Sequence, residues 1–286
     1  MTRHTATITT VAPDTSTRSR MLNAFEHATE RLDGRAASGA ELIWGWRGRT
    51  LSGPVIVGGA RVWLRLASGR SGEIAQTFWR GNATAQRDLP AAVPRPRLLV
   101  RDEWEAEPWR YAVEVFECSD RDPLNTRPVP SRPLAIGSLK DSWWSALRTA
   151  LDDVATVPTD RFTVGPVWAD KLVAEYFGPS DGPHPWMTCH GDLHWANLAG
   201  PDLVVFDWEG WGSGPLGYDA ATLLVHSLLA PDLAAEVRSR FADVLDGEHG
   251  RYAQQVVVAE QLWRRRDTPH DLLLPVLRDH AAMLCA

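Results

Sequence analysis

Hydrophobic residues change their spacing near the middle of the chain, which predicts two structurally different halves. A helix is expected over Arg18–Leu32, where apolar residues recur three or four positions apart and Gly34 follows as a stop. Short segments rich in Val, Ile, Leu and Trp come next, and Gly58-Gly59 forms a two-residue hairpin turn between two of them. We therefore expect an antiparallel meander of strands at residues 41–46, 50–57 and 61–67. Two further strands are expected at 98–101 and 111–117, with room for a short helix within residues 71–89.

Helical spacing dominates the second half of the chain. It follows the segment SDRDPLNTRPVPSRPL (residues 119–134), whose four prolines favour a linker or loop between the halves. Helices are expected at residues 141–154, 166–177, 219–229, 233–245, 251–264 and 271–284. The pattern thus predicts an α+β protein with a flexible tail over residues 1–20, a small β-rich portion over 21–117 and a larger helical portion over 118–286.

Composition narrows the function classes. Of 286 residues, 44% are hydrophobic and 23% charged, which is typical of a globular protein, and the net charge of -6 argues against nucleic acid as the main partner. No apolar run reaches the roughly 20 residues of a membrane-spanning helix, so no membrane partner is expected. Three widely spaced cysteines suggest neither disulfides nor a zinc knuckle, and the first 20 residues lack the apolar centre of a secretory signal. We expect a cytoplasmic protein.

The stretch CHGDLHWANLAGPDLVVFDWEGW (residues 189–211) concentrates polar groups around two apolar runs. A Gly200-Pro201-Asp202 turn between Leu198-Ala199 and residues 203–206 predicts a hairpin. Closing that hairpin brings Asn197 near Asp207, and Asp192 lies just upstream. Carboxylate and amide oxygens are ligands that Mg²⁺ prefers when phosphates complete its coordination shell. The geometry therefore suggests phosphoryl transfer.

The residues His190-Gly191-Asp192-Leu193-His194-Trp195-Ala196-Asn197 and Phe206-Asp207-Trp208-Glu209 resemble the HGDxHxxN and DxE signature of the aminoglycoside phosphotransferase family. The resemblance implies a two-lobed, protein-kinase-like fold with a β-rich nucleotide-binding N-lobe and a helical C-lobe. It also implies transfer of a γ-phosphoryl group from ATP, or GTP, to a hydroxyl. By this match Asp192 accepts or orients the hydroxyl proton, Asn197 and Asp207 hold Mg²⁺, and His190 and Asp219 support the loop.

The nucleotide-binding half departs from the family. Such enzymes place a phosphate-binding lysine on the third strand, but the only lysines here are Lys140 and Lys171. Arg65 occupies the corresponding strand position and can bind phosphate oxygens, although a solvated strand arginine is the alternative. Glu73 is the candidate for its carboxylate partner. By the resemblance, adenine docks on the backbone near Phe116, Glu117 and Cys118.

The acceptor is the least defined part of the prediction. An aminoglycoside or other antibiotic hydroxyl is the leading choice, which implies resistance by O-phosphorylation; choline, homoserine, a sugar or a nucleoside-type natural product stay open. Glu209, Trp195 and Trp211 are substrate candidates, since acids suit cations and indoles stack on rings. The alternative is that the tryptophans fill the core and Glu209 is a loop acid. Oligomeric state cannot be read from the sequence.

Two other functions compete with a working kinase. The missing lysine is compatible with an inactive nucleotide-binding sensor. His190 and His194, four residues apart, could instead bind zinc in a hydrolase, although Gly191 disfavours the helix that such a pair requires. Asp219 has a structural alternative too, as the N-cap of the helix that follows it.

Overall fold

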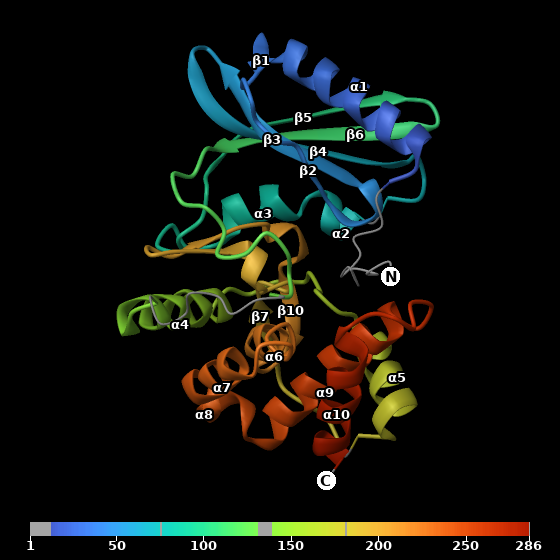
Figure 1. Ribbon diagram of the computed structural model, residues 1–286, viewed down its shortest axis with the longest axis vertical. Helices are drawn as coiled ribbons and strands as arrows, with labels where there is room; N and C mark the ends of the chain where they lie inside the picture. Colours follow the sequence, from blue (N-terminus) through green and yellow to red (C-terminus); the bar gives the residue numbers. More distant parts are fainter. Residues whose placement is uncertain (1–12, 75, 131–138, 181, 286) are drawn as a thin grey trace, which may run out of the picture. The chain divides into compact units, whose positions relative to one another are not determined.

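The computed structural model describes residues 13–74, 76–130, 139–180 and 182–285 (Figure 1). Within these residues the chain forms two compact units. The sheet unit comprises residues 13–87 and 96–120, and the helical unit comprises residues 88–95 and 121–285. The α+β class predicted from the sequence is confirmed, with an antiparallel sheet in the first unit and most helices in the second.

The sheet unit is built on a six-stranded antiparallel sheet in the order β1-β3-β4-β6-β5, with β2 paired to β3. The turn between β3 and β4 is Gly58-Gly59, and both glycines have the positive φ that a tight hairpin turn requires. The predicted meander is therefore present. Its strands are β1 (Gly34–Ala36), β2 (Ile43–Trp44), β3 (Thr50–Val57), β4 (Ala60–Arg70), β5 (Leu98–Ala106) and β6 (Trp109–Glu117).

Helix α1 (Thr15–Arg31) covers one face of this sheet, and α2 (Gln76–Trp79) and α3 (Gly81–Asp88) lie on the other (Figure 1). Alternate residues of β4 explain the packing: Val62, Leu64 and Leu66 are buried with Met21 and Phe25 of α1. Arg65 points to the opposite face. One side of the strand thus makes the core and the other side is left for polar groups.

The start of α1 corrects the predicted tail. Asp14 accepts a hydrogen bond from the backbone N–H of Thr17 at 2.9 Å, so the helix begins at Thr15 rather than within a flexible segment ending at residue 20. Residues 1–12 of that predicted tail lie outside the described residues. The sequence pattern missed this start because the first turn, Thr-Ser-Thr-Arg, is polar and exposed.

Strand β5 runs longer than predicted because its polar residues are paired. Its second half reads Arg-Asp-Glu-Trp-Glu, which has no strand-like hydrophobicity. As an edge strand it carries charges instead, with Arg101 and Arg110 both bound to Glu103 and Asp102 bound to Arg31. Ion pairs within β5, to β6 and to α1 therefore accompany the strand where its hydrophobic spacing ends.

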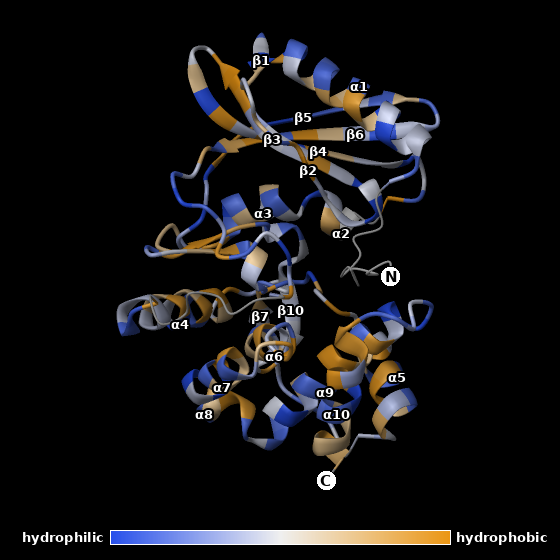
Figure 2. Cartoon of the chain, viewed as in Figure 1, coloured by the Kyte–Doolittle hydropathy of each residue, from blue (hydrophilic) through white to orange (hydrophobic). Residues whose placement is uncertain are grey.

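The helical unit contains two short two-stranded sheets together with its helices. Strands β7 (Trp186–Cys189) and β10 (Gly212–Pro215) pair with each other, as do β8 (Leu198–Ala199) and β9 (Val204–Val205). Figure 2 shows hydrophobic stretches along α5 and α9 as well as along the strands of the sheet unit. The helices are α4 (Asp141–Ala155), α5 (Pro166–Phe177), α6 (Tyr218–Val225), α7 (Pro231–Arg240), α8 (Ala242–Leu245), α9 (Glu248–Arg264) and α10 (Leu273–Cys285).

The proline-rich segment after Cys118 is packed against the helical unit, at least over its described residues up to 130. Pro123 bridges Ala199, and the backbone N–H of Leu124 donates to the carbonyl of Leu198 at 2.7 Å. Of the two predicted alternatives, the segment is therefore a packed loop rather than a free linker, and it adds backbone hydrogen bonds to the edge of β8. Residues 131–138 lie outside the described residues.

Among the described residues, none of the helices combines the length and apolar character that a bilayer crossing requires.

A buried histidine in α10 predicts acid sensitivity. His280 is 2% exposed and its Nε2 lies 3.2 Å from Gln254 Oε1; burial and the charge of Arg238 lower its pKa to about 4. The unfolded chain, with an ordinary pKa of about 6.5, binds this proton first, so stability falls as pH drops from about 6.5 to 4. The free energy of unfolding, measured by urea titration, should drop between pH 7 and pH 4.5 in both proteins. We expect the drop to be about 2–3 kcal/mol smaller in His280→Gln than in the wild type. Equal losses in both proteins would contradict this assignment.

Candidate active site

The predicted hairpin in the helical unit is confirmed. Leu198 pairs with Val205 and Ala199 with Val204, and the backbone N–H of Phe206 donates to the carbonyl of Asn197 at 2.8 Å. Asn197 and Phe206, the residue before Asp207, thus lie opposite each other at the end of the β8–β9 hairpin. Asn197 and Asp207 therefore stand together at the open end of the hairpin.

That loop, residues 190–194, is held by one buried carboxylate. Asp219 Oδ2 accepts the backbone N–H of His190 at 2.7 Å, and Oδ1 accepts that of Gly191 at 2.9 Å. Asp219 is 6% exposed, and burial raises its pKa although the two N–H donors oppose that rise. The N-cap interpretation of Asp219 is wrong, because α6 begins at Tyr218 with Gly217 as its N-cap. Its carboxylate serves the loop instead.

His190 connects the loop to the hairpin from inside the fold. Its ring is fully buried, with Nε2 2.8 Å from the carbonyl of Phe206 and Nδ1 accepting the backbone N–H of Asp192 at 3.2 Å. The proton therefore sits on Nε2, which donates to Phe206. Burial lowers the pKa of His190, which favours this neutral form. The structure places His190 where it fixes the positions of Asp192 and Asp207 together.

Asp192 lies at the end of this loop with about half of its side chain exposed (49%). Its Oδ2 is 3.4 Å from Nε2 of His194. Desolvation acts to raise the pKa of Asp192, but the adjoining His194 outweighs it and the pKa is lowered. For His194, burial acts to lower the pKa, and the carboxylates of Asp192 and Asp207 outweigh it and raise the pKa. Asp192 is therefore ionised at neutral pH, beside an imidazole whose own pKa is raised.

Asn197 and Asp207 complete the group of oxygen-bearing side chains. Asn197 is 7% exposed, and its Nδ2 donates to the carbonyl of Asp192 at 3.0 Å. With the amide nitrogen committed in this way, Oδ1 is the atom available as a ligand. Asp207 is exposed and has a left-handed backbone (φ 57°), which turns the chain out of the hairpin. A carboxylate oxygen and an amide oxygen are donors that fit Mg²⁺.

Two residues around Asp192 were missed by the sequence interpretation. His226, the C-cap of α6, lies edge-on to His194, with ring centroids 5.5 Å apart, and burial lowers its pKa to about 3. Arg264, at the end of α9, contributes positive charge that also lowers the pKa of Asp192, and it lies 3.8 Å from Glu260. They sit 34 and 72 positions after Asp192. No local pattern marks them, because only helix packing brings them close.

The tryptophans proposed as substrate contacts are core residues. Trp195 and Trp211 are both 0% exposed, so neither can stack on a ligand in this structure. Trp195 donates to Ser227 Oγ at 2.9 Å and packs against Trp143 and Trp144. The space-filling interpretation is therefore the correct one. Glu209 is half-buried and its carbonyl accepts a hydrogen bond from Arg161.

In the sheet unit, Arg65 forms a buried ion pair. Its Nη1 lies 3.0 Å from Glu114 Oε2, in the adjacent position on β6, and the two side chains are 11% and 2% exposed. Asn82 of α3 donates to the same oxygen at 2.8 Å. Glu73 is exposed and is not the partner of Arg65, which corrects that prediction. Glu114 was overlooked because the partner was sought on a helix, as in kinases, and the structure supplies it from a strand.

Residues Phe116 and Glu117 end β6, opposite Trp63 and Val62 of β4, and Cys118 follows them. The carbonyl of Arg97 accepts the backbone N–H of Glu117 at 3.0 Å. Their proposed contact with adenine stays a prediction.

The hypothesis of a zinc pair at His190 and His194 does not fit the geometry. The loop is not helical, and both ring nitrogens of His190 are engaged with backbone groups of Phe206 and Asp192. A histidine so engaged has no lone pair left for a metal. The hydrolase that depended on this pair is therefore not supported.

The loop admits only glycine at position 191, which yields a prediction. Gly191 has φ +87°, and a Cβ there would lie 2.1 Å from Thr163 Oγ1 and 2.6 Å from the carbonyl oxygen of Gly210. Gly178 has a similar φ of +89° but open space around it. We expect Gly191→Ala to lower unfolding free energy by at least about 2 kcal/mol more than Gly178→Ala, which carries only the backbone cost of about 1 kcal/mol. Equal losses in urea unfolding would show that the loop has room to shift.

Comparisons with known proteins agree with this geometry. Residues 166–254 match the family model described as the phosphotransferase enzyme family. A search of curated proteins found no match to the sequence.

Solved structures share the fold over nearly the whole chain. The crystal structure of aminoglycoside phosphotransferase APH(4)-Ia is 15% identical, with 93% of this chain and 99% of that chain covered and a TM-score of 0.63. A thermostable mutant of the same enzyme, in a ternary complex with ADP and hygromycin B, is 13% identical, with 91% and 97% covered and a TM-score of 0.61. The microcompartment-associated aminopropanol kinase is 16% identical, with 91% and 95% covered and a TM-score of 0.53.

The predicted protein-kinase-like fold is confirmed by these structures, and the loop residues from Cys189 to Asp219 lie within the matched segment. Residues 166–254 are therefore similar to the phosphotransferase enzyme family, and the chain shares the fold of these solved kinases.

Proposed function

We propose that the protein transfers the γ-phosphoryl group of ATP to a hydroxyl of a cationic small molecule, with Mg²⁺ bound to the nucleotide. The observation that carries the proposal is the convergence of three oxygen-bearing side chains around one braced loop. Asp192 is ionised and half exposed, Asn197 presents Oδ1, and Asp207 is exposed at the end of β9. This arrangement supplies one proton acceptor and two metal ligands, as phosphoryl transfer requires.

Asp192 acts on the acceptor hydroxyl. Because its pKa is lowered, it does not remove a proton from a free alcohol; it orients the hydroxyl and takes the proton as the oxygen bonds to phosphorus. His194 beside it holds the carboxylate in place. The hydrogen bond from Asn197 to the Asp192 carbonyl fixes the loop against the metal ligands.

Asn197 and Asp207 would hold Mg²⁺, which neutralises phosphate charge when bound. In the sheet unit, Arg65 fills the role of the kinase lysine. A guanidinium is always charged and can bind two phosphate oxygens, while Glu114 and Asn82 fix its direction. The Arg65–Glu114 pair therefore supports nucleotide binding, whereas the set of Asp192, Asn197 and Asp207 favours a working enzyme over an inactive sensor.

The acceptor we favour is an aminoglycoside antibiotic, with another amine-bearing alcohol as the alternative. The fold is shared with an aminoglycoside phosphotransferase, an aminopropanol kinase and a Plasmodium vivax ethanolamine kinase (TM-score 0.50, 11% identity, 87% of this chain and 83% of that chain covered). The compounds named are all amine-bearing alcohols. A net charge of -6 suits such cations.

The function is tested by ADP release with purified protein, Mg²⁺ and ATP against a panel of aminoglycosides and small amino alcohols. Asp192→Asn keeps the shape of the side chain but removes the proton acceptor, so kcat should fall about 10²–10⁴-fold while ATP affinity is retained. Asp202→Asn, on the turn of the same hairpin and exposed, is the matched control and should keep the wild-type rate. ATP binding without turnover of any acceptor, or full activity of Asp192→Asn, would contradict the proposal.

Arg65 and its partner give a second prediction. Arg65→Ala should weaken ATP binding by about 1–3 kcal/mol in calorimetric titration, since a charge-assisted phosphate contact is lost. Glu114→Gln should weaken it by less, because the arginine remains but loses its orientation. Arg61→Ala changes an exposed arginine on the same face of β4 and should leave ATP affinity unchanged. An effect of Arg61→Ala equal to that of Arg65→Ala would mean that only net charge matters.

A further inference from the structure

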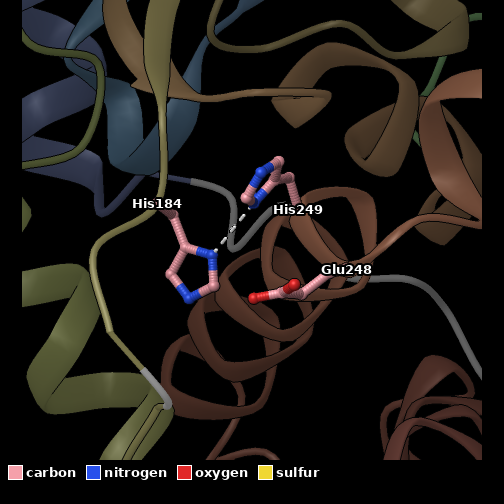
Figure 3. Close-up of side chains that lie close together, drawn as sticks. All are labelled: His184, Glu248 and His249. Atoms are coloured by element: carbon pink, nitrogen blue, oxygen red, sulfur yellow. Dashed lines mark hydrogen bonds between the residues drawn. The ribbon is translucent and has the colours of Figure 1, made fainter.

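A second group of potential ligands lies in the helical unit, outside the residues discussed above. His184 precedes β7, and Glu248 and His249 are the first two residues of α9. Each residue offers one ligand atom, and these atoms all lie within 4.8 Å of one another. Figure 3 shows the two imidazoles facing each other across a dashed contact, with the Glu248 carboxylate directed toward His184. No other three-residue group of this kind occurs among the described residues.

The distance between the two histidines suits a shared ion. Their Nδ1 atoms are 3.5 Å apart. Zinc–nitrogen bonds of about 2.0–2.1 Å at a tetrahedral angle place two ligand nitrogens about 3.3–3.4 Å apart. The imidazoles therefore need to move by only a few tenths of an ångström to bind one metal. A plain hydrogen bond between them is the competing explanation, and its 3.5 Å length is long for a strong one.

The His184 ring is fixed before any metal arrives. It stacks on Tyr252 with centroids 3.7 Å apart and planes 11° from parallel, and the Tyr252 hydroxyl donates to Asp170 at 2.7 Å. Its Nε2 is buried and has no hydrogen-bond partner. A ligand that is already fixed loses little entropy on binding.

Charge alone does not favour a cation here, because the amino end of α9 carries the positive end of the helix dipole. Glu248 offsets this effect, since its carboxylate is in the first turn and within the group. Two imidazoles and one carboxylate also form a ligand set that proteins use for zinc, with a fourth position open to water. Hard ions such as Mg²⁺ prefer oxygen ligands and are disfavoured by the histidines.

We propose that His184, Glu248 and His249 bind one divalent transition-metal ion of the Zn²⁺ type. The ion would join the segment that enters β7 to the start of α9. Strand β7 leads directly to His190, so the metal would stabilise the framework behind the loop without taking part in phosphoryl transfer. The site is independent of the Mg²⁺ ligands, and its test does not depend on the enzyme's acceptor.

The test uses the full chain, stripped with a chelator and titrated calorimetrically with Zn²⁺ in excess Mg²⁺, which occupies the oxygen ligands. The wild type should bind one Zn²⁺ per chain. His249→Asn should weaken binding at least about 100-fold, and Glu248→Gln, at an exposed position, about 10-fold. His270→Asn, an exposed histidine outside the group, is the matched control and should bind as the wild type does.

Thermal unfolding supplies a second readout that separates binding at this site from binding elsewhere. Zn²⁺ should raise the Tm of the wild type and of His270→Asn but not that of His249→Asn. Circular dichroism without metal shows whether the variants fold. Equal Zn²⁺ affinity in the wild type and His249→Asn would place the ion elsewhere, for example on exposed Cys285, and would overturn the proposal. A wild-type Kd weaker than about 10⁻⁴ M would overturn it as well.

Discussion

The candidate active site depends on one interaction, the acceptance of two consecutive backbone N–H groups by the buried carboxylate of Asp219. These donors belong to His190 and Gly191, whose chain turns through a positive φ and has no strand partner there. Without the carboxylate, buried N–H groups would be left unpaired, which costs about 1–3 kcal/mol each. The helix that carries Asp219 is thus joined to the loop that carries Asp192.

Both units solve the same electrostatic problem, that of holding a charge in a defined direction. Asp192 is flanked by His194 and by the more distant charge of Arg264, while Arg65 is held by Glu114. Each pair leaves part of one member accessible and buries the other. A charge held in this way needs no reorganisation when a substrate group of opposite sign arrives.

The sequence predicted most elements because hydrophobic spacing is a local property. The hairpin at residues 197–207 was predicted correctly because its Gly-Pro-Asp turn is a local signal. The alternation along β4, which directs Arg65 away from the core, was also predicted correctly. Errors arose where distant partners decide the outcome. Arg65 pairs with Glu114, which is 49 residues away, and the role of Trp195 depends on Ser227 and α4. Arg264 was missed for the same reason.

The buried cluster of Trp143, Trp144 and Trp195 has an optical consequence. Their rings lie within 5.0–6.5 Å of one another and are at most 3% exposed, so their emission should be shifted to short wavelength and coupled by energy transfer. Trp195 follows directly after His194, and its indole donates to Ser227. Intrinsic fluorescence of this protein therefore contains a signal from the segment next to Asp192, without any attached dye.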